Sequence, residues 1–225
     1  SSAGGNNYYL KWIQGQLKDS KLIAGIPYYS GEKLERKFYN SAVHIKADSI
    51  QNIYHKLQLV PMAEYIPLSG YFPALKKLKL GQANFTHGTE YTIMDVNTVK
   101  CAAMICFEST FPSLSRQFVQ NGAQVLIYLV NDGWYEHAPE PQQHASRLIY
   151  RSIETRRPII RCANTGISMV LDEYGNIIDI LDLNKKGNMD VTIYPSDKIT
   201  FYVRFGDIFI YFMMIVIVLS MFKKV

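Results

Sequence analysis

Cys106 is the residue in this sequence best suited to covalent chemistry, because it ends the apolar run "AAMIC" and is followed by Phe107 and Glu108. A cysteine attacks through its thiolate, a form favoured by nearby positive charge or a helix N-terminus. The apolar run predicts a strand and the residues from Phe111 a helix, which places the sulfur at a strand-to-helix turn. A cysteine in a buried strand would instead behave as a small hydrophobe, and the local pattern fits both interpretations.

Lys56 is the candidate source of positive charge for such a thiolate. It lies in "YHKLQLVPMAEYIP", which also places Glu64 beyond Pro61. A lysine is ordinarily a solvated surface charge. In a catalytic site, Lys56 would stabilise both the thiolate and an oxyanion forming on a substrate carbonyl.

The elements that must position these residues alternate between strands and helices. Two segments have helical patterns, 111–121 and 143–157, the second with an apolar stripe that stops at Pro158. Alternating elements of this kind predict a layered α/β domain. Short apolar runs predict the strands Leu22–Tyr28, Phe38–Ile45, Tyr91–Val96, Val99–Cys106, Val125–Val130, Ile159–Cys162, Ile167–Leu171, Ile177–Leu181 and Asp190–Tyr194.

Composition limits the classes of function. Hydrophobic residues form 48% of the 225 residues, enough for one sizeable core and too many for a disordered chain. The net charge of +5 comes without a dense Lys/Arg block, so nucleic acid is not expected as a partner. The three cysteines form neither a CxxC pair nor a zinc-type cluster with histidine, so we expect no metal site.

The C-terminal segment Ile208–Phe222 is free of charged residues. With Phe205–Asp207 and the pair Lys223–Lys224 it approaches the length of about 20 residues that a spanning helix needs. We therefore expect a transmembrane helix within residues 201–225 and a globular domain over residues 1–200. The lysine pair favours a cytoplasmic C-terminus, which places the globular domain on the outer side of the membrane.

Residues 69–85, "SGYFPALKKLKLGQANF", combine aromatic residues with three lysines. One interpretation is a solvated loop with a short helix. The other is a mobile flap that contacts anionic lipid headgroups, which the apolar C-terminus favours.

Five segments resemble the carbon–nitrogen hydrolase (nitrilase) superfamily: "GIPYYSG…KFYNSAVHI", "YHKLQLVPMAEYIP", "MICFES", "VNDGWY" and "RSIETRRPIIRCANTGIS". They look most like its membrane branch, the apolipoprotein N-acyltransferases. The resemblance implies a nitrilase-like α-β-β-α sandwich and a Glu–Lys–Cys triad. It matches Cys106 to the nucleophile, Lys56 to the lysine, Glu64 to a second glutamate near the site, and Glu108 to the acidic residue that follows the cysteine by two.

Other positions of the resemblance have supporting roles. Phe107 stands where the family often has tyrosine, and its backbone N–H is a candidate for the oxyanion hole. We expect Asn131, Asp132 and Trp134 to shape the rim of the pocket. A tight loop at the end of a strand is expected to depend on Asn164 and Gly166.

Two further groups are expected to be structural. His137 and His144 could be a catalytic or metal-binding pair. We interpret them as loop and helix-entry residues because a Glu–Lys–Cys triad needs no imidazole. The charged residues Arg147, Glu154 and Arg157 are expected to form ion pairs on the helix face.

The triad glutamate has no clear match. In the family it precedes the "GIPYY"-like strand in a proline–glutamate motif, whereas the only acidic residue before Gly25 is Asp19. We therefore expect the chain to begin after its general base, as an N-terminally truncated form of the domain.

The implied reaction is transfer of a fatty acyl group from a membrane phospholipid, through a thioester on Cys106, to the α-amine of the diacylglyceryl-cysteine of an apolipoprotein, at the bacterial cytoplasmic membrane. No cofactor is expected. Two alternatives stay open: a nitrilase-type hydrolase that acts on a small amide, and a catalytically dead, membrane-tethered remnant without its glutamate.

Overall fold

The computed structural model describes residues 8–32, 35–68, 71, 84–133 and 139–222. Its N-terminal part forms an antiparallel three-stranded sheet in the order β1-β2-β3. The strands are β1 (Leu22–Ser30), β2 (Lys37–Ile45) and β3 (Ile50–His55), and helix α1 (Tyr8–Leu17) precedes them. Lys56 follows the last residue of β3 directly.

A six-stranded sheet forms the centre of the fold, in the order β4-β5-β6-β7-β8-β9. The pairs β5–β6 and β6–β7 are parallel and the other pairs antiparallel. Its strands are β4 (Met94–Val96), β5 (Val99–Ile105), β6 (Val125–Val130), β7 (Ile159–Ala163), β8 (Ser168–Leu171) and β9 (Ile177–Leu181). The carboxyl ends of β5, β6 and β7 lie at one edge, where a site is expected in parallel sheets.

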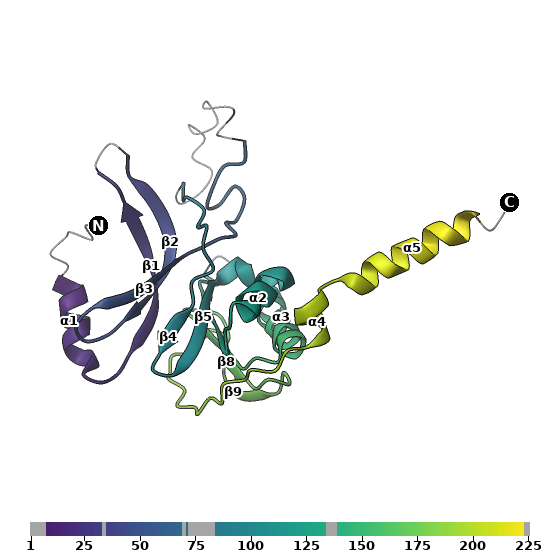
Figure 1. The fold of residues 1–225 in the computed structure, drawn as a ribbon. Coiled ribbons are helices and arrows are strands. Elements are labelled where there is room, and N and C mark those ends of the chain that lie inside the picture. The colour runs from purple at the N-terminus through teal and green to yellow at the C-terminus, as the bar shows by residue number, and fades with distance from the viewer. Residues whose placement is uncertain (1–7, 33–34, 69–70, 72–83, 134–138, 223–225) are drawn as a thin grey trace.

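Helices α2 (Pro112–Gln120) and α3 (Glu140–Thr155) cover one face of the six-stranded sheet, and the three-stranded sheet packs against the other through β2 and β5 (Figure 1). A short 3-10 helix, η2 (Cys106–Thr110), connects β5 to α2. The expected α/β fold class is confirmed.

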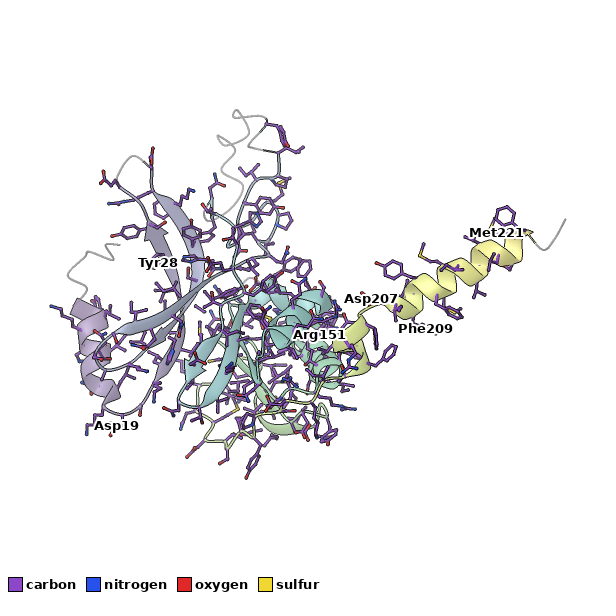
Figure 2. All side chains as sticks on the ribbon, viewed as in Figure 1. Asp19, Tyr28, Arg151, Asp207, Phe209 and Met221 are labelled. Carbon is purple, nitrogen blue, oxygen red and sulfur yellow. The ribbon has the colours of Figure 1, made fainter. Side chains whose placement is uncertain are left out.

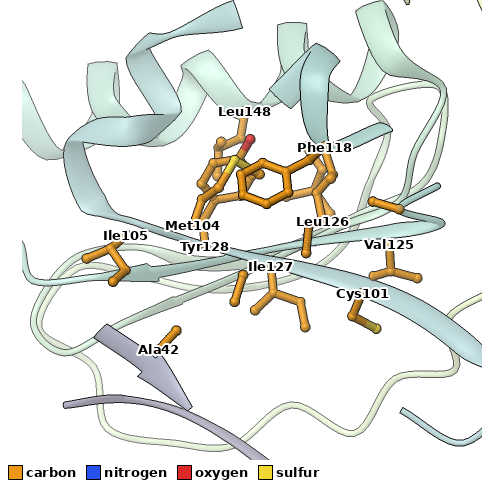
Figure 3. Close-up of a cluster of buried hydrophobic side chains, with 14 of the residues drawn as sticks. Ala42, Cys101, Met104, Ile105, Phe118, Val125, Leu126, Ile127, Tyr128 and Leu148 are labelled. Atoms are coloured by element: carbon orange, nitrogen blue, oxygen red, sulfur yellow. The ribbon is translucent and has the colours of Figure 1, made fainter. Parts of the chain in front are cut away.

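The core has one layer on each face of the central sheet (Figure 3). Alternation along each strand sends successive side chains to opposite faces. Because both faces are covered, β5 and β6 are continuous apolar runs, as is typical of buried parallel strands. On the helix side lie Met104, Leu126, Tyr128, Phe118 and Leu148, and on the side of β2 lie Cys101, Ile105, Ile127 and Ala42.

Several predicted elements match the structure and one does not. The bounds predicted for β6 and β9 are those observed, and the other matching strands differ at their ends by a few residues. The predicted strand Asp190–Tyr194 was wrong, since this segment pairs with no strand of the described chain. Its apolar alternation has another cause: Ile193 packs against the core from an unpaired segment.

The chain ends in two helices, α4 (Phe201–Phe205) and α5 (Ile208–Phe222). Thr200 caps α4 by accepting a hydrogen bond from the backbone N–H of Val203 (3.0 Å) and donates to the Glu154 carbonyl (2.6 Å). Gly206 ends the helix at φ 62°, in a region that glycine adopts readily.

Two side chains of α2 bind the elbow, the segment 200–207 that comprises α4 and its connection to α5. The Arg116 guanidinium donates to the carbonyls of Tyr202 (3.1 Å) and Val203 (3.0 Å), and the Gln120 amide donates to the Val203 carbonyl (2.8 Å). These are carbonyls at the C-terminal end of a helix, where cationic donors are favourable. Helix α4, which leads into α5, is therefore fixed to α2.

Helix α5 has the bounds predicted for the apolar C-terminal segment, and it extends away from the globular part with all its side chains exposed (Figure 2). Within the described residues, no helix is both long enough and apolar enough to cross a bilayer. The expected transmembrane helix is thus not confirmed. With 15 residues, α5 is about 22 Å long, shorter than a hydrocarbon core of about 30 Å.

Candidate active site

Cys106 lies at the turn between β5 and η2, half-buried, with φ at 50°. This left-handed conformation is disfavoured for residues with a Cβ and is found at functional turns. The sulfur lies 3.9 Å from the Asn131 carbonyl oxygen, just beyond the end of β6. The thiol is therefore held at the carboxyl ends of two neighbouring parallel strands.

The environment makes this thiol harder to deprotonate. Burial raises the pKa of Cys106, and the charges of Asp132 and Glu64 add to that increase. The positive charge of Lys56 opposes it and lowers the pKa. Because the net shift is upward, the thiol needs a proton acceptor before it can act as a nucleophile.

Lys56 is buried, with 1% of its side chain exposed, and its ammonium lies 2.7 Å from Glu64 Oε2. The same carboxylate accepts hydrogen bonds from the Val60 backbone N–H (2.8 Å) and from the Asn40 side chain (2.8 Å). A buried ammonium needs such a partner, since desolvation is costly. Glu64 thus fixes the lysine that acts on Cys106.

Glu108 connects the segment after β3 to the Cys106 turn. Its Oε1 accepts from the Tyr54 hydroxyl (2.6 Å) and from the backbone N–H groups of Leu57 (2.8 Å) and Gln58 (3.0 Å). Its Oε2 accepts from the Ile105 N–H (2.7 Å). Burial raises the pKa of Glu108, and the hydrogen bonds from Tyr54, Ile105 and Gln58 oppose the shift. With both oxygens engaged, this fully buried carboxylate holds together the segments that carry Lys56 and Cys106.

Asp132 lies beneath the surface and not at the rim where the sequence placed it, since only 1% of it is exposed. Its Oδ1 lies 2.9 Å from Nδ1 of His144 and its Oδ2 2.5 Å from the Arg161 guanidinium. A Cβ added to Gly166 would lie 2.0 Å from Asp132 Oδ2, so the carboxylate fits only against a glycine.

Asn131 and Asn164 join the ends of β6 and β7. The Asn164 amide donates to Asn131 Oδ1 (2.6 Å) and accepts from the Asp132 N–H (3.2 Å). This agrees with the loop-fixing role expected of Asn164. Trp134 and His137 lie outside the described residues.

His144 belongs to the site, although the sequence favoured a purely structural interpretation. It lies on the buried face of α3, and its Nε2 is 2.8 Å from Ser109 Oγ and 3.2 Å from the Cys106 carbonyl oxygen. The available signal was its position on the same helical stripe as Ala145 and Leu148. That stripe predicts burial, and a buried histidine needs hydrogen-bonding partners.

The charged residues of α3 interact differently from the expected ion pairs. Glu154 pairs with Arg151 (2.9 Å), while Arg147 is exposed. Arg157 is buried and donates to backbone carbonyls, among them Ala123 (2.6 Å) and Lys198 (2.5 Å). The chain reversal after α3 leaves several carbonyls facing inward, and the guanidinium satisfies them.

A pocket of about 230 Å³ opens beside the Cys106 turn. The Phe107 side chain forms part of its wall and packs edge-on against Phe111, with ring centroids 5.2 Å apart. The pocket is lined by Phe107, Thr110, Glu140, Gln143, His144 and Arg147. Part of a substrate could therefore approach the turn from the side of α3.

Cys106, Asp132 and His144 offer ligand atoms within 4.8 Å of one another. The carboxylate oxygens and ring nitrogens in this cluster already bind each other, Arg161 and Ser109. A metal ion could bind here only if these hydrogen bonds broke. The cluster is better suited to a hydrogen-bonded network around the thiol.

Comparisons with known proteins place the chain in a family. A family model described as carbon-nitrogen hydrolase matches residues 3–198. Apolipoprotein N-acyltransferase of Geobacter metallireducens is 31% identical over 204 residues, which cover 89% of this chain and 39% of that protein. The enzyme of the same name from Thermotoga maritima is 36% identical over 184 residues, 81% of this chain and 36% of that protein.

The chain thus spans about two fifths of the length of these curated relatives. Among solved structures, a carbon-nitrogen hydrolase from Helicobacter pylori G27 is similar, with a TM-score of 0.61, 20% identity, and coverage of 79% of this chain and 64% of that one. An amidase from Nesterenkonia sp. has a TM-score of 0.57, 17% identity, and coverage of 77% and 62%. At these identities the similarity shows the fold alone. Together with the family match over residues 3–198, it establishes that this chain belongs to the carbon–nitrogen hydrolase family.

Proposed function

We propose that this chain carries the nucleophile and the cation of an acyl-transfer site that matures bacterial lipoproteins. The observation that carries the proposal is the half-buried Cys106, held at a strained turn and subject to the charge of buried Lys56. The relatives named apolipoprotein N-acyltransferase, matched over most of this chain, support the acceptor class.

The reaction has two steps. In the first, the Cys106 sulfur forms a bond to an ester carbonyl of a membrane phospholipid, the carbon–oxygen bond breaks, and the lysophospholipid leaves with a proton. In the second, the α-amine of a diacylglyceryl-cysteine forms an amide bond, the thioester breaks, and the thiol is regenerated. Lys56 and the Phe107 N–H stabilise the oxyanion in both steps, and no cofactor is required.

The proton acceptor is assigned to a carboxylate other than Glu64, Glu108 and Asp19. Glu64 is engaged by Lys56 and Asn40, and Glu108 by its four donors. Asp19 is exposed and lines a surface pocket with Lys46 and Asn97. This arrangement supports the family pattern, in which a separate glutamate acts as base.

Helix α5 supports a location at the membrane. Its 15 residues are exposed and lack a polar face, which is typical of a segment in contact with lipid. We assign residues 1–200 to the catalytic domain and 201–225 to the membrane-proximal segment and anchor. In this arrangement the domain lies on the outer face of the bacterial cytoplasmic membrane and the C-terminus lies in the cytoplasm.

The test is to trap the thioester in the full-length protein, embedded in membranes that contain phospholipid with a labelled acyl chain. We expect a label that hydroxylamine releases, that Cys106→Ala abolishes, and that passes to the amine of a diacylglyceryl-cysteine peptide. The control is Cys162→Ala, because Cys162 is exposed and belongs to no part of the proposed site.

Each other outcome contradicts the proposal in a different way. Label that persists in Cys106→Ala excludes this nucleophile. Acyl groups that pass only to water indicate a hydrolase of the amidase type, and an unlabelled wild-type protein indicates an inactive remnant.

A further inference from the structure

We propose that His144 is a positioning residue that holds the backbone carbonyl of Cys106 and so fixes the direction of its thiol. The inference rests on the proposed acyl-transfer function for its consequence. Its geometric basis, a contact between α3 and the nucleophile turn, is independent of the reaction.

The imidazole is held at both nitrogens. Nδ1 lies 2.9 Å from Asp132 Oδ1, and Nε2 lies 3.2 Å from the Cys106 carbonyl oxygen and 2.8 Å from Ser109 Oγ. The ring is 5% exposed. Because the ring is buried and bonded at both nitrogens, it cannot move without also moving Asp132, Ser109 or the Cys106 carbonyl.

The Asp132 carboxylate, itself bound to Arg161, sets the orientation of the His144 ring. Arg161, on β7, binds the other oxygen of Asp132 at 2.5 Å, and both of these side chains are buried. An ionised carboxylate beside a guanidinium accepts hydrogen bonds, so Nδ1 is the donor to Asp132. A continuous path therefore runs from the central sheet, through Asp132 and His144, to the Cys106 turn.

The protonation of Nε2 decides whether His144 can donate a hydrogen bond to the Cys106 carbonyl. The Cys106 carbonyl can only accept a hydrogen bond, whereas the Ser109 hydroxyl can donate or accept. Because Nδ1 already carries the proton that it donates to Asp132, a second proton on Nε2 makes the ring an imidazolium, the form in which both nitrogens donate and the Asp132 carboxylate balances the charge. His144 thus provides a donor to the carbonyl of the nucleophile itself.

The turn needs such a restraint. Cys106 has φ at 50°, a conformation that a residue with a Cβ keeps only when surrounding contacts hold it. Glu108 restrains the turn from within, through the Ile105 N–H. His144 restrains it from a different helix, α3, through the Cys106 carbonyl. Loss of this contact would let the peptide rotate and move the sulfur.

A pair of variants in the full-length protein separates positioning from structural support. In His144→Gln the amide nitrogen reaches the region of Nε2 and can still donate to the Cys106 carbonyl. In His144→Asn the shorter amide reaches only the region of Nδ1 and keeps the partnership with Asp132. His144→Gln loses the contact with Asp132, and His144→Asn loses those with the Cys106 carbonyl and Ser109, so both should lose thermal stability and each rate is compared with the stability loss of its own variant.

We expect His144→Asn to slow single-turnover formation of the labelled thioester by about 10- to 100-fold, because a displacement of about 1 Å can cost on the order of 100-fold. The phospholipid concentration for half-maximal rate should stay within about threefold. His144→Gln should recover most of the lost rate. If the two variants lose rate equally, or only in proportion to their stability, the proposal is wrong.

A second measurement does not depend on acyl transfer. The rate of Cys106 alkylation by iodoacetamide is followed by the mass of the Cys106 peptide, with exposed Cys162 as internal reference. We expect His144→Asn, and not His144→Gln, to change the Cys106 rate by at least threefold. This result supports positioning even if the wild type forms no thioester, which would contradict only the proposed function.

Ser109→Ala identifies which contact of Nε2 matters. It removes the hydroxyl and leaves the Cys106 carbonyl as the partner described for Nε2. The alkylation rate should stay near that of the wild type. A change as large as that of His144→Asn would assign the effect to Ser109 and overturn the proposal, even if the His144 variants fold poorly.

Discussion

Glu108→Gln tests whether a buried carboxylate holds the two halves of the candidate site together. The substitution preserves size and shape and removes only the negative charge and one acceptor. In its better orientation, the amide oxygen takes the place of Oε1 and keeps the hydrogen bonds from Tyr54, Leu57 and Gln58. The amide nitrogen then faces the Ile105 N–H, so two donors meet where a donor and an acceptor met before.

The expected loss follows from this count of contacts. One hydrogen bond to a charged group, lost in a buried position, costs about 1.5–3 kcal/mol. For a chain of this size, each kcal/mol lowers Tm by about 2–4 °C. Glu108→Gln should therefore lower Tm by about 3–12 °C. Because the lost bond is the one to the Cys106 turn, the rate of Cys106 alkylation should change as well.

The assay is thermal unfolding of the full-length protein in detergent micelles, followed by intrinsic fluorescence. The matched control is Glu173→Gln, the same substitution at a carboxylate whose partner Lys198 is exposed. It should shift Tm by no more than about 2 °C. Equal shifts for both variants would show that Glu108 is not a tether, and our reasoning about the site would be refuted.

Two more predictions concern charge and space near Cys106. Lys56→Met removes a charge that lowers the pKa of the thiol, so it should slow alkylation of Cys106 at pH 8 by about 3- to 10-fold; Glu64→Gln removes a charge that raises it and should accelerate the reaction. Gly166→Ala forces a Cβ against Asp132 and should cost about 1–3 kcal/mol, measured by chemical denaturation.

Controls for these variants are available in the same chain. A Cβ at Gly15, in α1, would meet nothing within 4 Å, so Gly15→Ala should be neutral or slightly stabilising. The charge argument fails if Lys56→Met and Glu64→Gln change the alkylation rate in the same direction. The steric argument fails if Gly166→Ala unfolds at the same denaturant concentration as the wild type.

The layered α/β fold was predictable because each buried strand carries its own apolar signal. The runs that became β5 and β6 are apolar on both faces, which identifies central strands without knowledge of their neighbours. Two elements carried a weaker signal. Neither α1 nor β3 was predicted, and β3, "IQNIYH", mixes polar and apolar residues without a continuous apolar run.

The candidate site was predictable in part. Cys106 and Lys56 stand out through their local context and family motifs, whereas His144 and Arg161 acquire their roles from partners on other elements. Asp132 was assigned to the rim because a polar residue after a strand is usually exposed. Its burial depends on a guanidinium from β7 and on the open space above Gly166, which no short sequence pattern encodes.

The elbow at Gly206 has a consequence for insertions and deletions. One residue added between Arg204 and Ile208 would turn α5 by about 100° around its long axis, but a helix that is apolar on every side presents the same kind of surface after that rotation. One residue added between Thr200 and Val203 would instead withdraw the carbonyls from Arg116 and Gln120. The length of the first segment can therefore vary with little effect on this surface, while the second segment sets the direction in which α5 leaves the globular part.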